Sequence, residues 1–330
     1  AADGRVRSRL VFSGEDSDGF RDRSGIERQG FLASVAMDVT ARTQVGLGFQ
    51  YEHSIFHGAS WGANVPAWFA DGSPTHFRRS LNLAADWSKS DMEAKTLFAS
   101  LDHRFDNDWK LRADYAHTSR ADLNNKGAIK VNNGKVRWPH WKQDGSGAYL
   151  NAIHSETEGE TDAVSLDLSG PLELLGRRHE LLVGLNGSRM DEPSWTFNSS
   201  NCSIDGIAGF KGRCQYRTEL PVADWRAWRG DEYGNIRAFR TDARRVTRTT
   251  LYGGYVAGRF ELADDLTLIT GLRRSLYQIH SDNYNAAGVR GARTGENAAH
   301  AWTPYYGLVY GLTPTYSVYA SYTDVFTPQT

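Results

Sequence analysis

The chain contains few sulfur-bearing residues and no long apolar segment. Its 330 residues include two cysteines and three methionines. No run approaches the roughly 18 consecutive apolar residues that a membrane-spanning helix requires, so a helical membrane protein is excluded. The 38 basic and 39 acidic residues give a net charge of -1, which provides no indication of nucleic acid or of a strongly charged partner.

The motifs of common enzyme classes are also missing. The sequence has no G-x-S-x-G elbow, no phosphate-binding glycine loop and no cluster of cysteine and histidine. His140 and His154 have no second ligand at a usual metal-binding spacing, so we interpret them as loop histidines. We therefore expect no catalytic residue, no metal site and no cofactor, with an outer-membrane hydrolase as the remaining enzyme alternative.

Alternating strand patterns are abundant. Val45, Leu47, Phe49 and Tyr51 occupy every second position, and Gly48 lies on the opposite, polar face of that segment. A barrel in the outer membrane hides its apolar band in this way, so the mean hydropathy of -0.54 does not exclude one. On this pattern we expect Leu47→Arg to be harmful and Gly48→Ser to be mild.

Strands pair into hairpins through short turns, and long polar connections separate the hairpins. We count eleven strands, with turns at Thr40–Thr43, 106–108, 263–265 and 313–315. The expected long connections cover about 54–92, 119–161, 190–247 and 281–301. Long loops on one side and tight turns on the other are typical of a transmembrane barrel, whereas a soluble sandwich has no reason to separate them.

Two segments carry a resemblance to a known family. The stretch from Trp302 to Gln329, WTPYYGLVYGLTPTYSVYASYTDVFTPQ, resembles a hairpin of TonB-dependent ferric-siderophore receptors, with Gly311 where the family usually has Asp. Gly170-Pro171-Leu172 and the following LLGRRHEL, which begins at Leu174, resemble the ferric-pyoverdine receptor branch. The resemblance implies an all-β, antiparallel transmembrane barrel in the outer membrane of a Gram-negative cell.

On this resemblance, residues 1–330 form one partial barrel domain. It holds about eleven strands of a barrel of about 22, and the plug domain and the C-terminal strands are absent. The implied function is uptake of ferric siderophores, with the iron already chelated and with energy from the TonB-ExbB-ExbD complex acting through the absent plug. Outer-membrane lipid and lipopolysaccharide are the expected surroundings. A passive porin-like or adhesin-like barrel and a soluble all-β binding module are the alternatives.

Tryptophan marks the expected binding surface. Eight of the ten Trp residues fall in or beside the long connections, and indoles offer rigid contact area to a flat chelate. Trp61, Trp87 and Trp138 match family motifs, which implies an aromatic pocket; the full set of predicted substrate-binding residues is Trp61, Trp87, Trp138, Trp141, Trp225 and Trp228. The alternative is that these indoles pack the loops against one another or against the plug.

The connection at about 190–247 contains the remaining candidates. Cys202 and Cys214 are the only cysteines and lie in one expected extracellular loop, so we predict that they form a disulfide. The arginines of this connection could contact an anionic chelate or lipopolysaccharide phosphates, or simply be solvated. These arginines are Arg213, Arg217, Arg226, Arg229, Arg237, Arg240, Arg244 and Arg245.

Overall fold

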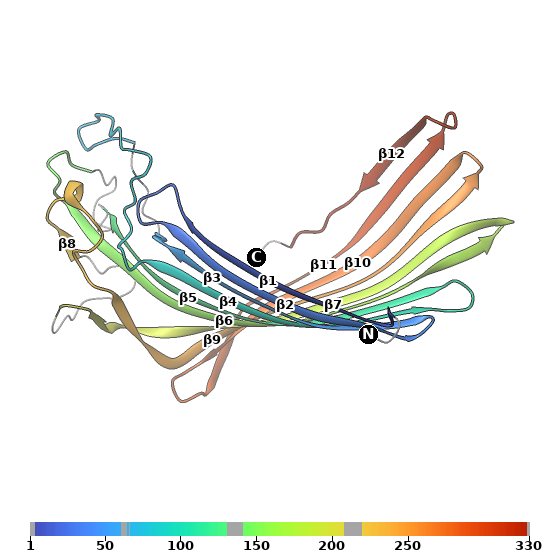
Figure 1. Cartoon of the computed structure of the whole chain (residues 1–330), viewed down its shortest axis with the longest axis horizontal. Coiled ribbons are helices and arrows are strands. Elements are labelled where there is room, and N and C mark those ends of the chain that lie inside the picture. Colours follow the sequence, from blue (N-terminus) through green and yellow to red (C-terminus); the bar gives the residue numbers. More distant parts are fainter. Residues whose placement is uncertain (1–3, 61–64, 66, 131–140, 208–219, 329–330) are drawn as a thin grey trace.

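The structure is one curved antiparallel sheet (Figure 1). The computed structural model describes residues 4–60, 65, 67–130, 141–207 and 220–328. The strands are β1 (Val6–Asp18), β2 (Gly25–Thr40), β3 (Thr43–His57), β4 (Lys89–Arg104), β5 (Lys110–Lys130), β6 (Ala148–Leu174), β7 (Arg177–Ile204), β8 (Leu220–Val222), β9 (Ile236–Ala263), β10 (Leu266–Tyr284), β11 (Arg290–Gly311) and β12 (Ser317–Thr323), and a 3₁₀ turn, η2, covers Trp225–Ala227.

Strand order follows the sequence. Eleven strands pair with their neighbours along the chain, from β1 to β7 and then from β9 to β12, while the short β8 pairs with the start of β6. The predicted all-β class and the count of eleven consecutive strands are therefore confirmed for the described residues. The predicted turns are also confirmed; between β6 and β7, Leu175 and Gly176 both have positive φ, at 53° and 75°, as a two-residue hairpin turn of matching twist requires.

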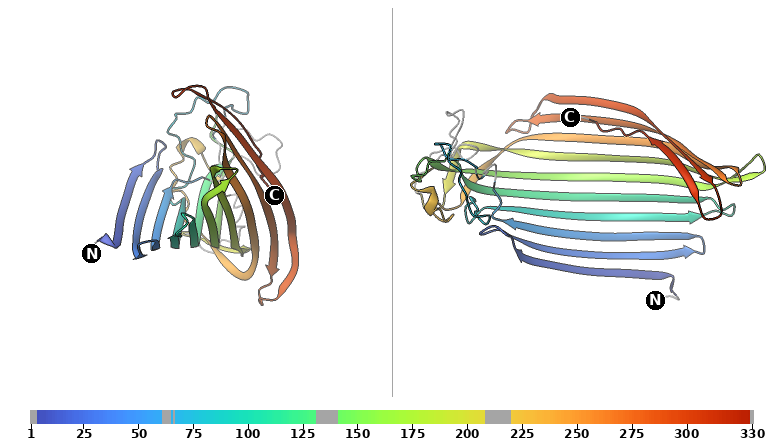
Figure 2. Two further views of the ribbon diagram at one scale, coloured as in Figure 1. Left: turned by 90° about the vertical axis from the view of Figure 1, so that its right-hand side faces the viewer. Right: turned by 90° about the horizontal axis from the view of Figure 1, so that it is seen from above.

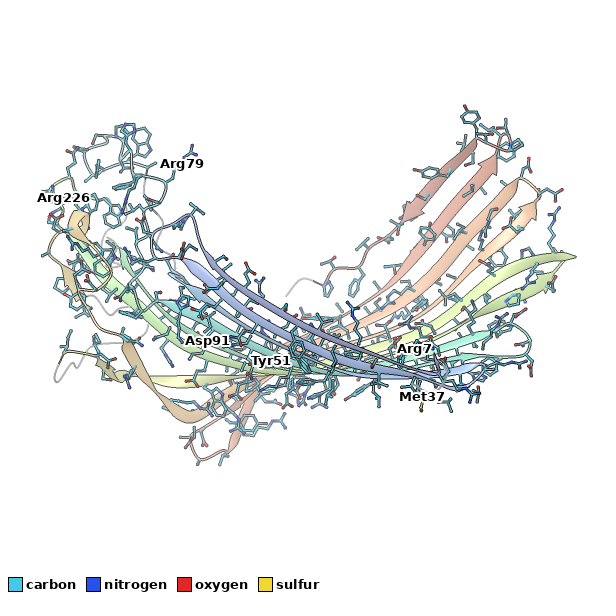
Figure 3. All side chains as sticks on the ribbon, in the orientation of Figure 1. Arg7, Met37, Tyr51, Arg79, Asp91 and Arg226 are labelled. Atoms are coloured by element: carbon cyan, nitrogen blue, oxygen red, sulfur yellow. The ribbon has the colours of Figure 1, made fainter. Side chains whose placement is uncertain are left out.

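The two faces of the sheet differ in polarity. Met37 lies on the convex side and Arg7 on the concave side (Figure 3). On the convex face Leu47 is 66% exposed, and many of its neighbours there are likewise exposed apolar side chains. On the concave face Arg7 donates two hydrogen bonds of 2.7 Å to Asp38. The sheet therefore presents apolar side chains outward and charged pairs inward.

Glycines on the concave face make room for aromatic rings of the next strand. A Cβ atom on Gly48 would lie 2.2 Å from Cζ of Phe98, and one on Gly184 would lie 2.3 Å from Cζ of Tyr255. Such cross-strand packing covers the glycine and stabilises its strand. The expectation that Gly48→Ser is mild stays a prediction, and it requires the ring of Phe98 to move away from the space that the serine would occupy.

All four expected long connections are shorter than the sequence indicated, the first of them by only a few residues at each end. Strands β10 and β11 leave only residues 285–289 between them, where 281–301 was expected. Similarly, β5 and β6 extend inward to Lys130 and Ala148, and β7 and β9 extend to Ile204 and Ile236. Along these extensions the regular alternation of exposed apolar and polar residues stops while the backbone pairing continues, and the apolar residues that remain, such as Ile129 and Leu150, are buried under the loops.

Within the described ranges, no helix has the length and apolar character needed to cross a membrane.

Connections gather at one end of the sheet, away from the tight turns (Figure 2). Buried apolar side chains concentrate there, in a core that contains Leu83, Ile129, Leu150 and Val222 among others. The sheet thus positions a compact cap of loops above the ends of its strands.

Candidate functional site

The candidate site is the cap of loops at this end of the sheet, which we call the roof. It comprises the described residues of 58–88, 141–147 and 205–235, and it rises on the concave side of the strands (Figure 1). Residues from all three connections share one hydrophobic core with the ends of β5 and β6. The roof therefore holds three segments that are far apart in the sequence.

Tryptophan side chains form the centre of the roof core. Trp141, Trp225 and Trp228 are only 2%, 7% and 8% exposed. The rings of Trp141 and Trp225 meet edge to face, with centroids 4.9 Å apart, and Phe77 meets Trp225 at 5.4 Å in the same manner. Edge-to-face contact is a preferred arrangement for aromatic pairs, so these rings stabilise the junction between loops.

Hydrogen bonds fix Trp225 and its neighbours in place. Nε1 of Trp225 donates to the carbonyl oxygen of Lys142 over 2.9 Å, and Arg226 donates to the carbonyl oxygen of Gln143 over 2.9 Å. Asp224 begins the 3₁₀ turn and accepts from the Arg226 amide. The Arg226 guanidinium also holds the pKa of the Asp224 carboxyl below its usual value. Residues 141–147 are therefore clamped to residues 224–228.

Trp87 lies where the roof meets the strands. Its Nε1 donates to the carbonyl oxygen of Tyr233 over 2.9 Å, which joins the connection before β4 to the connection before β9. A Cβ atom on Gly127 would lie 2.4 Å from the Trp87 ring, so that glycine admits the indole. Trp87 is half-buried and packs against both apolar clusters of the roof.

The structure brings together four of the six tryptophans predicted to contact substrate. Trp141, Trp225 and Trp228 contact one another or their common core, as the packing alternative describes, and Trp87 packs at the edge of that core. Trp61 and Trp138 lie outside the described residues. Contact of any of the six with a ligand stays a prediction.

The predicted disulfide cannot be placed, because Cys214 lies outside the described residues. Cys202 belongs to β7, whose backbone pairs at that point with Ala238 of β9. The pairing of the two cysteines stays a prediction.

Two lysines beneath the roof were missed in the sequence analysis. Lys126 and Lys130 lie near the end of β5, and by strand alternation they share the concave face with Arg112. Burial lowers the pKa of both ammonium groups. Both lysines lie next to the roof. The alternation that places both lysines on one face can be followed in the sequence of β5, but both residues lie in the segment 119–161, which was expected to be a loop.

The arginines of the connection at about 190–247 do not form one group in the structure. Arg226 and Arg229 belong to the roof, while Arg240 and Arg244 lie on β9 against the ring of Trp195. Arg213 and Arg217 lie outside the described residues. No group of three or more His, Cys, Asp or Glu side chains suited to a metal ion occurs in the part of the chain that the structure describes.

Comparison with known proteins identifies a family. The family model described as "TonB dependent receptor-like, beta-barrel" matches residues 37–330. The ferripyoverdine receptor of Pseudomonas aeruginosa is 29% identical over 99% of this chain and 36% of its own length. The ferric-pyoverdine 358 receptor of Pseudomonas putida is 30% identical over 99% of this chain and 37% of its own length. The chain thus spans little more than a third of these relatives.

Solved structures give the same result. The outer-membrane ferripyoverdine receptor of Pseudomonas aeruginosa bound to ferripyoverdine superimposes with a TM-score of 0.80 and 27% identity, covering 100% of this chain and 39% of that one. The ferric-catecholate import receptor Fiu of Escherichia coli, in its open form, has a TM-score of 0.72 at 16% identity, covering 97% and 50%, and shows the shared fold alone.

Proposed function

Because this chain belongs to the TonB-dependent receptor β-barrel family, whose members are outer-membrane receptors and not enzymes, we propose that it takes part in the uptake of ferric siderophores of the pyoverdine class. The observation that carries the proposal is the match to ferric-pyoverdine receptors over 99% of the chain. Fold similarity to a receptor bound to ferripyoverdine supports it.

In this proposal the tryptophans have two roles. Trp141, Trp225 and Trp228 hold the roof together, since their indoles are buried against one another and against the loop core. Trp61, Trp87 and Trp138 approach the chelate, because they carry the motif resemblance and because Trp87 lies at the edge of the roof. The lysines Lys126 and Lys130 add positive charge on the concave side, toward which an anionic ferric chelate would be attracted.

Transport requires more than binding. We assign the energy to the TonB complex acting through a plug, as is general for the family, and we treat the iron as cargo that arrives chelated. The strands supply the scaffold, since their concave face carries the charged and polar groups that a plug or a hydrated ligand would meet.

Uptake of radiolabelled iron tests the proposal in cells that express the full-length protein as their sole siderophore receptor. Iron delivered as ferric pyoverdine should enter energised cells and should stop entering when the proton gradient is collapsed. Uptake that persists without the gradient and shows no preference among small solutes would support the passive-barrel alternative instead.

Ala variants of Trp61, Trp87 and Trp138 separate ligand contact from packing when each is scored for surface abundance and for chelate affinity. Loss of an indole that contacts the chelate should weaken binding by about 1 to 3 kcal/mol.

A further inference from the structure

Tyr255 lies flat against the concave wall of the sheet instead of projecting from it. Asp167 of β6, Gly184 of β7 and Tyr255 of β9 are consecutive cross-strand partners, so they belong to one row on the concave face. The Tyr255 hydroxyl crosses Gly184 and donates a hydrogen bond to Oδ1 of Asp167. Gly184 is buried, and a Cβ atom there would overlap the Tyr255 ring. The ring is therefore laid across β7 and tied to β6.

Arg273 of β10 repeats this arrangement one strand further along. Its Nη2 crosses Gly253 of β9 and donates to Oδ1 of Asn186 on β7 over 2.8 Å. Its Nε donates to Oγ of Ser275 over 3.0 Å. Gly253 is buried, and a Cβ atom there would overlap the guanidinium, which also lies 5.6 Å from the centroid of the Tyr255 ring. Two long side chains are thus held against the wall, with glycines beneath them and hydrogen-bond acceptors on the far side.

Both side chains lie at the height of the hydrocarbon layer. Tyr255 and Arg273 are cross-strand partners. On the convex face the adjacent row of partners is Val183, Val256 and Leu272, and all three are exposed apolar side chains. Such a row on the outside of a barrel marks the part that meets lipid. A ferric chelate that crosses the membrane inside the barrel must therefore pass the height of Tyr255 and Arg273.

The same row is not held down in this way on β5. Arg112 is the cross-strand partner of Asp167, pairs with Asp114 of its own strand over 2.8 Å, and has a side chain that is 61% exposed. Arg273 is half-buried by comparison. Because strand side chains stand roughly perpendicular to their sheet unless they are held, an untethered Tyr255 or Arg273 would extend into the lumen. The two tethers therefore lower the concave wall from β7 to β10.

We propose that Tyr255 and Arg273 are positioning residues for transport. Held flat over glycines, they keep a passage for the ferric chelate open along the concave wall of β7, β9 and β10. The inference rests on the proposed function, because it requires that a chelate moves through the lumen. It assigns no ligand contact to either side chain. Removal of Tyr255 or Arg273 should therefore be tolerated, whereas displacement of either into the lumen should obstruct uptake.

Uptake of radiolabelled ferric pyoverdine by cells that express full-length variants tests the proposal, with rates expressed per folded receptor. Gly184→Val fills the space beneath the Tyr255 ring, and the φ of Gly184 is not positive, so the strand can accept valine. The ring must then leave the wall. We expect most of the uptake rate to be lost while the affinity for ferric pyoverdine is unchanged, since the roof lies at the far end of β7. Ser188→Val is the matched control on the same face of the same strand, where its partners are Ala163 and Leu251 and not an aromatic ring.

The double variant Gly184→Val with Tyr255→Ala separates obstruction from other causes. Removal of the ring should restore uptake to near the natural rate, whereas a defect in stability or in ligand contact would become worse with the second change. Gly253→Val, alone and together with Arg273→Ala, repeats the comparison at the second tether and serves if Gly184→Val does not fold.

Natural uptake by folded Gly184→Val protein would overturn this inference alone. A double variant that stays as impaired as Gly184→Val, or an equal loss in Ser188→Val, would overturn it as well. Absence of uptake by the natural protein would overturn the proposed function and this inference with it, so the two failures are distinguished within one assay.

Discussion

His179 and Glu261 are joined by a hydrogen bond in which the backbone amide of Glu261 donates to Nδ1 of His179 over 3.0 Å. Nε2 of the same ring lies 3.1 Å from the carbonyl oxygen of Leu174, so it carries the proton and donates. The ring is buried where β9 shifts register against β10, between Glu261 and Ala263. His179 therefore connects the β6–β7 turn to the bulge in β9.

The two arginines before His179 extend this connection. Arg177 pairs with Asp264 in the β9–β10 turn at 2.9 Å, and Arg178 lies 3.8 Å from Asp108 in the β4–β5 turn. The LLGRRHEL segment, which carried part of the family resemblance, thus joins three tight turns. Its role in this chain is structural.

Replacement of His179 by Ala should destabilise the barrel by about 1 to 3 kcal/mol, because it leaves the Glu261 amide without its partner. Urea unfolding of the full-length protein in vesicles, followed by the shift in gel mobility on unfolding, measures the change. Arg178→Gln is the control and should cost less than about 1 kcal/mol, since its ion pair is exposed. Equal effects of the two variants would show that the buried His179 ring contributes no more to barrel stability than an exposed ion pair does.

Leu47→Arg should prevent or weaken assembly by about 2 to 4 kcal/mol, because the side chain points from the convex face toward the lipid. Gln50→Arg places the same residue on the concave face of the same strand and should be tolerated. Heat-modifiable mobility of both variants in the full-length protein provides the readout. If Leu47→Arg assembles as well as Gln50→Arg, the convex face does not contact lipid.

Trp225→Ala should loosen the roof, because a cavity would open between Trp141, Phe77 and the 3₁₀ turn. A buried aromatic truncated to Ala typically costs about 3 to 5 kcal/mol. Limited proteolysis of the folded protein should show faster cleavage near residues 141–147 and 220–230. Trp68→Ala is the matched control, since Trp68 is 57% exposed, and it should leave the cleavage rate unchanged.

Acid should separate the upper parts of β7 and β9. Burial alone would raise the pKa of Asp191, but hydrogen bonds from Arg248 and Arg189 outweigh it and hold that pKa below its ordinary value of 3.8. The ion pairs therefore contribute stability above that value and lose it as the pH falls through the folded-state pKa. Hydrogen exchange of residues 189–195 should rise below about pH 4.

Asp191→Asn should show the same exchange at neutral pH, because an amide cannot balance the two guanidinium groups. Glu192→Gln, on the opposite face of the same strand, is its control. Unchanged exchange in Asp191→Asn at pH 7 would show that the ion pairs of Asp191 do not hold the upper parts of β7 and β9 together.

The sequence predicted the strands better than the loops, for a physical reason. Where one face meets lipid, as at Leu47, apolar residues alternate and both strand and turn can be identified. Beyond the bilayer, as at Arg248 and Asp282, both faces meet water and the pattern disappears although pairing continues. Strand ends were therefore interpreted as loops, which also concealed Lys126 and Lys130.

The tryptophans show the corresponding limit for the site. A count of indoles in polar connections shows where aromatic residues are abundant, but it cannot distinguish Trp225, buried among Trp141 and Phe77, from an indole that contacts a ligand. That distinction depends on which loops meet in space. Local sequence contains no information on the contact between residues 141–147 and 224–228.

Equilibrium binding of ferric pyoverdine to the full-length protein in detergent distinguishes a siderophore receptor from a passive barrel. We expect saturable binding of the ferric chelate, much weaker binding of an unrelated ferric chelate such as ferric citrate, and none of uncomplexed ferric ion. Trp87→Ala should weaken the ferric-pyoverdine affinity by about tenfold while Trp68→Ala leaves it unchanged. Absence of saturable binding by any ferric siderophore, in protein whose barrel is shown to be folded by its gel mobility, would show that the protein is not a siderophore receptor.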